Sequence, residues 1–401
     1  MMSKLSELIE QLCPDGVEYK SIGSIITRVT EKGKDDTSVQ QVYVVSNTQG
    51  LVRAEEYRKN TIHSEDTSNY TIVRKNMMAY NPSRLNIGSI AMLKNDTDGL
   101  VSPMYIVFSI DNSKVLYEYF NYVVKSSAIA NKISSFKEEG ARFRFDFSRW
   151  NWIDIPVPPL PIQEEIVRIL DAFVQYSNVL TAELTARKKQ YAFYLDDLFK
   201  NIDAPMVSLG ELGTLTRGKR FVHADATESG VPCIHYGELY TYYGVYAEKV
   251  RSHIREELRP KMRYAHKGDV VIVGAGENNI DIGIGVAWEG DEDVAVHDAC
   301  YTLCHSQNAK YISYYLRSNT YHNQITKYVS QGKICSISAT KIGEALIPIP
   351  SLDEQSRIVS ILDRFDSLCS DITDGLPAEI EARQKQYEYY RDKLLTFESA
   401  K

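Results

Sequence analysis

The sequence has few cysteines and no long apolar run. Its six cysteines are scattered over 401 residues, so no disulfide framework is indicated and reduced thiols are expected. No apolar stretch approaches the roughly 20 residues that cross a bilayer. The opening MMSKLSELIEQL lacks the basic region and small-residue cleavage site of a signal peptide. These absences predict a cytoplasmic protein with no membrane partner.

Basic residues are outnumbered by acidic ones, 46 against 53, so the formal net charge is -7. Such a balance argues at first against a nucleic-acid partner, because phosphate contacts need cations. The negative excess is local, however. Ser351–Lys401 carries eleven acidic against seven basic residues, and Pro161–Lys200 carries six against five. The rest of the chain is close to neutral and can carry local basic patches.

Two stretches imitate nucleotide-binding loops without completing them. The segment GTLTRGKR, Gly213–Arg220, has the glycines and lysine of a phosphate-binding loop, but Arg220 stands where the magnesium-binding Ser or Thr belongs. The segment VVIVGAGENN, Val270–Asn279, resembles a dinucleotide fingerprint, but Asn279 replaces its third glycine. Neither stretch favours a bound nucleotide cofactor.

Catalytic and metal-binding patterns are incomplete as well. Asn81–Arg84, Asn-Pro-Ser-Arg, lacks the second proline and the aromatic residue of the loop with which amino-methyltransferases hold adenine, so we interpret it as a turn. In a strand, Cys300 and Cys304 would share one face while His297 and His305 face the other, which disfavours a metal site. No nuclease constellation and no nucleophile elbow is found. The sequence predicts a chain that catalyses nothing by itself.

A long amphipathic helix is predicted twice. From Pro161 to Phe199, apolar residues recur every three or four positions, the spacing of one helix face. A related stretch begins at Ser351, where Gln355 corresponds to Gln163. Two such stripes most simply bury each other as an antiparallel coiled coil. The later copy has four extra residues near Gly375 and Pro377, which should kink or interrupt its helix.

The segments between these helices repeat too, at a period near 190 residues. Short β-like runs separated by Asn, Gly and Pro turns are followed by a helical YEYFNYVVKSSAIANKI in the first half and YISYYLRSNTYHNQI in the second. We therefore predict an α+β protein with an internal pseudo-twofold repeat. Its predicted parts are a first mixed α/β domain with an N-terminal helical segment at 1–155, a helical spacer at 156–203, a second mixed domain at 204–348 and a C-terminal helical spacer at 349–401.

Basic, amide and small polar residues gather in loops at matching places of the two halves. Arg and Lys suit phosphates and guanine edges, and Asn and Gln suit adenine edges. For each single residue the alternative is an ordinary solvated side chain, because 25% of the chain is charged. The candidate DNA-binding residues are Arg28, Lys32, Lys34, Asn81, Ser83, Arg84, Arg142 and Arg144 in the first half, and Arg217, Lys219, Arg220, Asn278, Asn279 and Lys333 in the second.

The sequence resembles the specificity subunits of Type I restriction-modification systems over essentially its whole length. The resemblance lies in the opening LIEQLCPDGVEYKSIG, in IPVPPLPIQEEIVRILDAF and IPIPSLDEQSRIVSILDRF, and in the endings TARKKQYAFYLDDLF and EARQKQYEYYRDKLLTF. It implies two target recognition domains, each reading one half of a split, asymmetric double-stranded DNA site. It also implies that the helices of the family's conserved regions set the gap and dock two methyltransferase subunits. S-adenosylmethionine and ATP would be used by the methyltransferase and restriction (translocase) subunits, with no cofactor bound by this chain.

Three other interpretations remain open. A non-catalytic coiled-coil scaffold that binds protein partners agrees with the negative charge but not with the paired basic loops. An enzyme would need a complete cofactor loop, and both candidate loops fail at defining positions. A simple repressor is disfavoured because no helix-turn-helix pattern is present.

Overall fold

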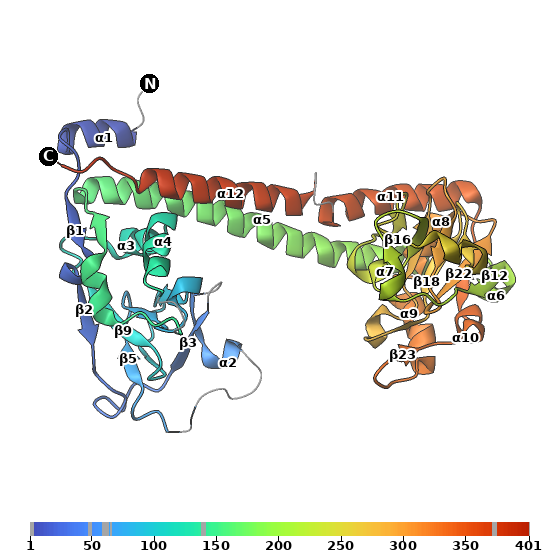
Figure 1. Ribbon diagram of the computed structural model, residues 1–401, viewed down its shortest axis with the longest axis horizontal. Helices are drawn as coiled ribbons and strands as arrows, with labels where there is room; N and C mark the ends of the chain where they lie inside the picture. The colour runs from blue at the N-terminus through green and yellow to red at the C-terminus, as the bar shows by residue number, and fades with distance from the viewer. Residues whose placement is uncertain are drawn as a thin grey trace. The chain divides into compact units, whose positions relative to one another are not determined.

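The computed structural model describes residues 4–46, 50–57, 64, 66–137, 142–370 and 375–400. The chain divides into two compact units, Met1–Val179 with Glu381–Lys401, and Leu180–Ile380. We call them unit 1 and unit 2. One continuous helix, α5 (Leu160–Lys200), belongs to both units (Figure 1), which confirms the long helix predicted from the apolar spacing.

Unit 1 is a mixed α/β domain followed by helices. Its elements are α1 (Lys4–Leu12), β1 (Tyr19–Ser21), η1 (Ile22–Ser24), β2 (Ile26–Val29), β3 (Val42–Ser46), β4 (Gly50–Arg53), α2 (Ala54–Tyr57), β5 (Thr71–Val73), β6 (Met78–Tyr80), η2 (Leu85–Ile87), β7 (Ile90–Met92), β8 (Gly99–Val101), β9 (Ile106–Ile110), α3 (Tyr117–Val123), α4 (Ser127–Ser135), η3 (Phe147–Trp152) and β10 (Asp154–Pro156). The start of α5 and the end of α12 (Leu376–Leu394) complete it.

With several additional short elements, unit 2 has a similar succession of strands and helices. They are β11 (Met206–Ser208), α6 (Leu209–Leu212), β12 (Gly213–Arg217), η4 (His223–Asp225), β13 (Ala226–Thr227), β14 (Val231–Ile234), α7 (Glu238–Thr241), β15 (Tyr246–Ala247), β16 (Ser252–Ile254), η5 (Glu256–Lys261), β17 (Tyr264–Ala265), β18 (Val270–Val273), β19 (Ala275–Gly276), η6 (Asn279–Asp281), β20 (Gly285–Trp288), β21 (Val294–Val296), β22 (Cys300–His305), α8 (Ala309–Tyr315), α9 (Asn319–Ile325), η7 (Thr326–Tyr328), β23 (Cys335–Ser336), α10 (Ala339–Gly343), β24 (Leu346–Pro348) and α11 (Leu352–Ser370).

The sheets of the two units share one topology. The order β2-β9-β6-β7 in unit 1 matches β12-β22-β18-β20 in unit 2, where β15 is added at the edge. The order β4-β3-β8-β5 matches β16-β14-β21-β17, where β13 is added. The parallel pair occupies the same place in each second sheet, β3 with β8 and β14 with β21. The sequence repeat is therefore a repeat of topology.

The helical segment after each sheet is broken where a single helix was expected. In unit 1, α3 ends at Val123 and α4 begins at Ser127. The Ser126 side chain caps α4 by accepting a hydrogen bond from the backbone N–H of Ile129 at 3.4 Å. Ser318 caps α9 in the same way. Serine stabilises a helix start, because its hydroxyl satisfies an otherwise unpaired N–H, so each segment folds as two short helices.

In unit 1, hydrogen bonds connect the domain to α5. Gln163, fully buried, accepts a hydrogen bond from the Leu116 N–H at 2.9 Å and donates one to the Pro158 carbonyl at 2.7 Å. The Tyr122 hydroxyl donates to the Asp171 carboxylate at 2.5 Å. A buried amide that lost these partners would leave backbone groups unpaired, so the contacts specify how the domain and helix meet.

The same contacts recur between the domain and α11 in unit 2. Gln355, also fully buried, accepts from the Asn308 N–H at 3.0 Å and donates to the Pro350 carbonyl at 2.9 Å. The Tyr314 hydroxyl donates to the Asp363 carboxylate at 2.6 Å. Gln163 and Gln355 are matched in the sequence repeat, and Tyr122 and Tyr314 belong to the two corresponding helical stretches, YEYFNYVVKSSAIANKI and YISYYLRSNTYHNQI.

Antiparallel helix pairs complete each unit. In unit 1, Phe173 of α5 stacks on Tyr390 of α12, with ring centroids 5.5 Å apart. In unit 2, Tyr194 of α5 stacks on Phe365 of α11, also at 5.5 Å. The C-terminal helical segment is interrupted as predicted: α11 ends at Ser370 and α12 begins at Leu376. Residues 371–374, part of the predicted insertion, lie outside the described residues.

Candidate nucleic-acid interface

A pocket of about 680 Å³ opens in unit 1 between three parts of its first sheet. The end of β2, the connection from β6 to β7 and the segment before β9 form its walls. Its lining includes six of the eight candidate residues of the first half, Arg28, Lys32, Asn81, Ser83, Arg84 and Arg144. Residues more than a hundred positions apart in the sequence thus share one cavity.

Some of these polar groups already have partners. The Asn81 side-chain oxygen accepts a hydrogen bond from the Ser83 N–H at 3.0 Å. The Lys32 ammonium donates to the Thr71 hydroxyl at 2.9 Å. The Arg144 guanidinium contacts the Asp146 carboxylate at 3.2 Å. These contacts orient the side chains and leave part of their hydrogen-bonding capacity available to a ligand.

Arg28 and Arg84 differ from these residues. Both are exposed, and neither forms an ion pair with a carboxylate of the described chain. An arginine without a carboxylate partner keeps its planar set of donors for phosphate or for the O6 and N7 of guanine. These two residues are therefore the most available cations of the pocket.

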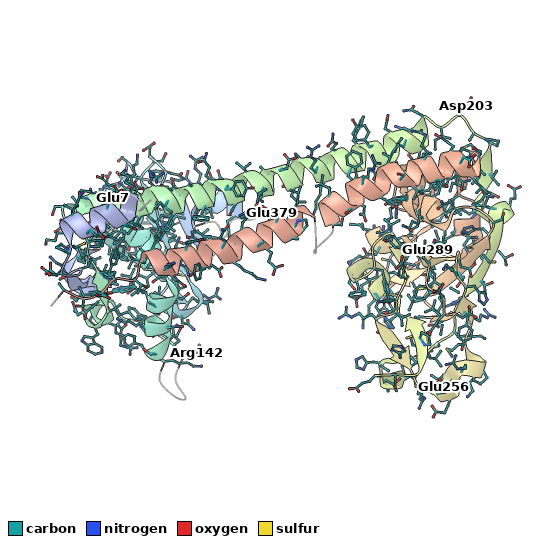
Figure 2. All side chains as sticks on the ribbon, turned by 90° about the horizontal axis from the view of Figure 1, so that it is seen from above. Glu7, Arg142, Asp203, Glu256, Glu289 and Glu379 are labelled. Carbon is teal, nitrogen blue, oxygen red and sulfur yellow. The ribbon has the colours of Figure 1, made fainter. Side chains whose placement is uncertain are left out.

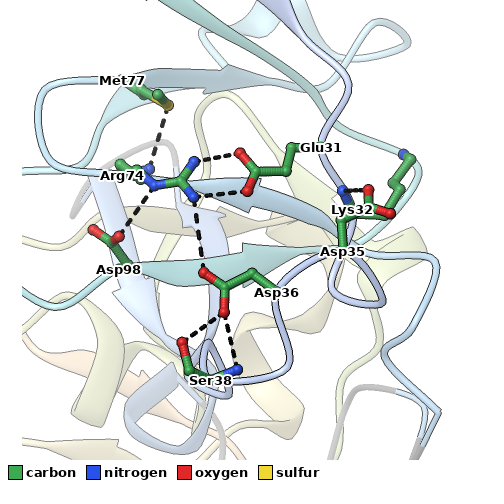
Figure 3. A network of polar contacts seen from close by, with 8 residues as sticks. All are labelled: Glu31, Lys32, Asp35, Asp36, Ser38, Arg74, Met77 and Asp98. Carbon is green, nitrogen blue, oxygen red and sulfur yellow. Dashed lines mark hydrogen bonds and ion pairs between the residues drawn. The ribbon is translucent and has the colours of Figure 1, made fainter.

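The loop that carries Lys32 is braced by an ionic network (Figure 3). Arg74 contacts Glu31 through two nitrogens, at 2.5 and 2.8 Å, and reaches Asp98 at 3.3 Å and Asp36 at 3.9 Å. The hydrogen bonds from Arg74 lower the pKa of Glu31. Arg74 is thus neutralised within the unit, and its role here is to hold the loop.

Unit 2 has a larger pocket, of about 850 Å³, at the equivalent place in its sheet. Three candidate residues line it: Arg217 at the end of β12, Arg220 and Lys333. The Arg217 guanidinium donates to the Asp298 carbonyl at 2.7 Å. Arg220 and Lys333 are exposed and have no ion pair within the described part of unit 2.

Five candidate residues do not line either pocket: Lys34, Arg142, Lys219, Asn278 and Asn279. Arg142 extends from the outside of unit 1 (Figure 2). The Asn278 amide donates to Asp281 at 3.2 Å, and the Lys219 backbone pairs with His297. All five side chains are exposed, so they lie on the surface rather than in a cavity.

The second pocket also contains rings that sequence reasoning did not select. His223, His235 and Tyr236 line it together with Phe221 and His297. The rings of His235 and His297 lie 4.7 Å apart, although 62 positions separate the residues. No local motif signals this proximity, because it arises from the parallel pairing of β14 with β21.

Two other kinds of feature are absent from the described residues. No group of three or more His, Cys, Asp or Glu side chains in that part of the chain is arranged to hold a metal ion. No described helix combines the length and apolarity that crossing a membrane requires.

Comparison with known proteins identifies the family of the chain. The model of the Type I restriction modification DNA specificity domain matches residues 14–187 and again 201–382. The chain is 34% identical to the Type I restriction enzyme EcoR124I/EcoR124II specificity subunit of Escherichia coli, over 74% of each chain. It is 33% identical to a putative type I restriction enzyme specificity subunit of Haemophilus influenzae, over 71% of this chain and 72% of that one.

Two solved structures share the fold. A chain from a study of complex assembly and conformational transition in the type I R-M system aligns with a TM-score of 0.67 at 17% identity, covering 96% of this chain and 98% of that one. The HsdS subunit from Thermoanaerobacter tengcongensis aligns with a TM-score of 0.52 at 17% identity and the same coverage. With the double family match, these findings show that the chain belongs to the Type I restriction modification DNA specificity domain family, as a Type I specificity subunit.

Proposed function

We propose that the chain is the sequence-specific DNA-binding subunit of a Type I restriction-modification complex. Residues 1–155 and 204–348 act as target recognition domains, and each reads one half of a bipartite, asymmetric site in double-stranded DNA. The helical segments 156–203 and 349–401 set the gap between the half-sites and dock two methyltransferase subunits. The chain has no catalytic step of its own; the methyltransferase subunits use S-adenosylmethionine, and the restriction (translocase) subunits use ATP.

One observation carries this proposal: two different cation-bearing pockets occupy equivalent places in a repeated sheet. The end of β2 corresponds to the end of β12, and the connection after β6 corresponds to that after β18. A shared frame with different linings suits two readers of different sequences, because side chains at base edges specify sequence. The family membership of the chain supports this interpretation.

The first test maps methylated adenines after co-expression with a type I methyltransferase subunit that assembles with the chain. We expect one bipartite motif with a fixed gap. A stable complex that methylates nothing would favour the alternative of a non-catalytic scaffold for protein partners. Unsplit motifs would contradict the proposal of two readers.

The two pockets can then be separated by substitution. Arg28→Ala with Arg84→Ala should weaken recognition of the first half-site only, and Arg220→Ala with Lys333→Ala that of the second only. Each lost phosphate contact should reduce the salt slope of binding by about 1. Lys75→Ala, at an exposed lysine of unit 1 that lies outside the pocket and pairs with Asp96, is the control. Equal losses at both half-sites would count against independent readers.

The spacer role is tested by deleting two helical turns from α5 between Phe173 and Arg187, with a matching deletion in α12. Seven helical residues span about 10 Å, close to three base pairs at about 3.4 Å each. We expect a changed gap and unchanged half-sites. An unaltered gap would remove the spacer role from the helices.

A further inference from the structure

The second pocket contains a cluster of rings that the first pocket lacks. The His235 ring contacts those of His297, at 4.7 Å, and Tyr236, at 4.5 Å between centroids, and the latter two rings are 5.5 Å apart. Phe221 packs edge-on against His297 at 4.9 Å. The described lining of the first pocket contains no histidine, and Tyr105 is its one aromatic residue. The two pockets therefore offer different chemistry to a ligand.

His297 is fixed in one orientation by its own hydrogen bonds. Its Nδ1 accepts from the Ala299 N–H at 3.1 Å, and its Nε2 donates to the Phe221 carbonyl at 3.1 Å. Burial, assisted by the neighbouring His235, lowers the pKa of His297, so the ring is neutral at pH 7. Because both of its nitrogens are hydrogen-bonded, His297 can contact a ligand only through the face of its ring. It also packs against the His235 ring.

His235 has one nitrogen occupied and one available. Its Nδ1 accepts a hydrogen bond from the Gly237 N–H at 3.4 Å, which places the proton of the neutral ring on Nε2. Its backbone N–H donates to the Glu238 carboxylate at 3.0 Å, so the main chain is also held. Burial lowers the pKa of His235. No hydrogen-bond partner of Nε2 lies among the residues that the structure describes.

A fixed donor differs from the flexible cations around it. Arg220 and Lys333 are long, exposed side chains and suit phosphates, which contribute affinity and register rather than sequence information. Arg217 is partly occupied by the Asp298 carbonyl. The half-buried His235 ring packs against two neighbouring rings and is held by its Nδ1 hydrogen bond. It therefore loses little freedom on binding, which favours discrimination between base edges.

We propose that His235 is a specificity-determining residue of the second recognition domain, an inference that rests on the proposed DNA-reading function. Its Nε2–H donates to an acceptor on a base edge in the major groove: N7 of a purine, O6 of guanine or O4 of thymine. A cytosine at the contacted position presents only its N4 donor there and is rejected. His297 acts as a positioning residue by holding the His235 ring.

Two substitutions of His235 test the Nε2–H donor separately from the packing of the ring, and a third substitution, at His266, is the control. His235→Asn can keep an acceptor near Nδ1 for the Gly237 N–H but removes the donor at Nε2. His235→Gln places an amide donor near the Nε2 position. His266→Asn is the matched control, because His266 lies in the same unit, outside the pocket, with 63% of its side chain exposed and paired with Asp293.

The experiment compares methylation motifs and binding to a set of second half-sites with each base varied. We expect His235→Asn to relax one position of the second half-site, with about a tenfold loss of discrimination against the wrong base. His235→Gln should retain most of this discrimination. The first half-site, the gap and the His266→Asn motif should match the unsubstituted protein.

The outcomes distinguish the proposed DNA-reading function from the role of His235 within it. If the unsubstituted complex shows no bipartite motif, the proposed function fails and this inference fails with it. A bipartite motif that His235→Asn leaves unchanged overturns the role of His235 alone. Equal loss of the entire second half-site in the Asn and Gln variants also overturns it, because His235 would then support the fold rather than read a base.

Discussion

Units 1 and 2 are alike where each domain meets its helices and different where each forms its pocket. The buried glutamine, the tyrosine–aspartate pair and the aromatic stack occur in both units with distances that agree within 0.2 Å. The pockets share their place in the sheet, but one is lined by cations and one amide and the other by cations and imidazoles. The two halves of the chain thus share the contacts between domain and helix and differ in the side chains that line their pockets.

The largest expected effect concerns the shared contact. Gln163→Ala and Gln355→Ala each leave a buried backbone N–H and a carbonyl unpaired, which should cost each unit about 2–4 kcal/mol of unfolding free energy. Hydrogen exchange resolved by unit, during denaturant titration, measures both losses. Gln384→Ala, on the exposed face of α12, should change little. A loss confined to one of the two variants would show that the junctions are not equivalent.

The helices and the repeat were predictable because their signal is periodic and local. Apolar spacing predicted α5 to within one residue at each end, and the matched Gln163 and Gln355 occupy equivalent contacts. The breaks at Ser126 and Ser318 were not predicted, since a cap within an apolar pattern competes with continued helix. In each unit, the hydrogen bond of one serine side chain determines that the helical segment breaks there.

The pockets were predictable only in part. Arg28, Asn81 and Arg84 were selected because their loops carry polar residues near turns, and the sheet brings them together. His235 could not be selected, because its neighbour His297 follows β21, a strand distant in the sequence. Exposed Arg142 carries the same chemistry as Arg144, which lines the pocket. Composition identifies suitable loops, whereas topology decides which residues converge.

The next largest effect concerns pH: acid should lower the stability of unit 2 more than that of unit 1. Four histidines of unit 2 have pKa values lowered chiefly by burial: His235, His297, His305 and His322. Below the unfolded-state pKa, about 6.5, the unfolded chain binds protons more readily than the folded unit, so stability falls as pH drops. The described part of unit 1 contains no histidine; His63 lies outside it.

Unit-resolved hydrogen exchange at pH 7.5 and pH 5.5, corrected for intrinsic exchange rates, checks this expectation. Unit 2 should lose protection while unit 1 changes little in this range. The pKa of His266 is raised by its hydrogen bond to Asp293, so protonation favours the folded state there. Its exposure makes that opposing contribution small. Equal acid sensitivity in the two units would show that the buried imidazoles do not govern it.

The smallest expected effect concerns the aspartate that contacts the start of a short helix in each unit, because this contact is stronger in unit 2. Asp392 caps α4 by accepting from the Ser127 N–H at 3.0 Å, whereas Asp196 caps α9 by accepting from the Asn319 N–H and side-chain amide, both at 2.7 Å. Loss of a helix cap costs about 1 kcal/mol. Asp392→Ala should cost about that amount by denaturant titration, and Asp196→Ala more, because it also leaves the Asn319 amide without its acceptor. The opposite order would mean that the two copies differ in strain or solvation at this contact, so that contact geometry alone does not rank their stability.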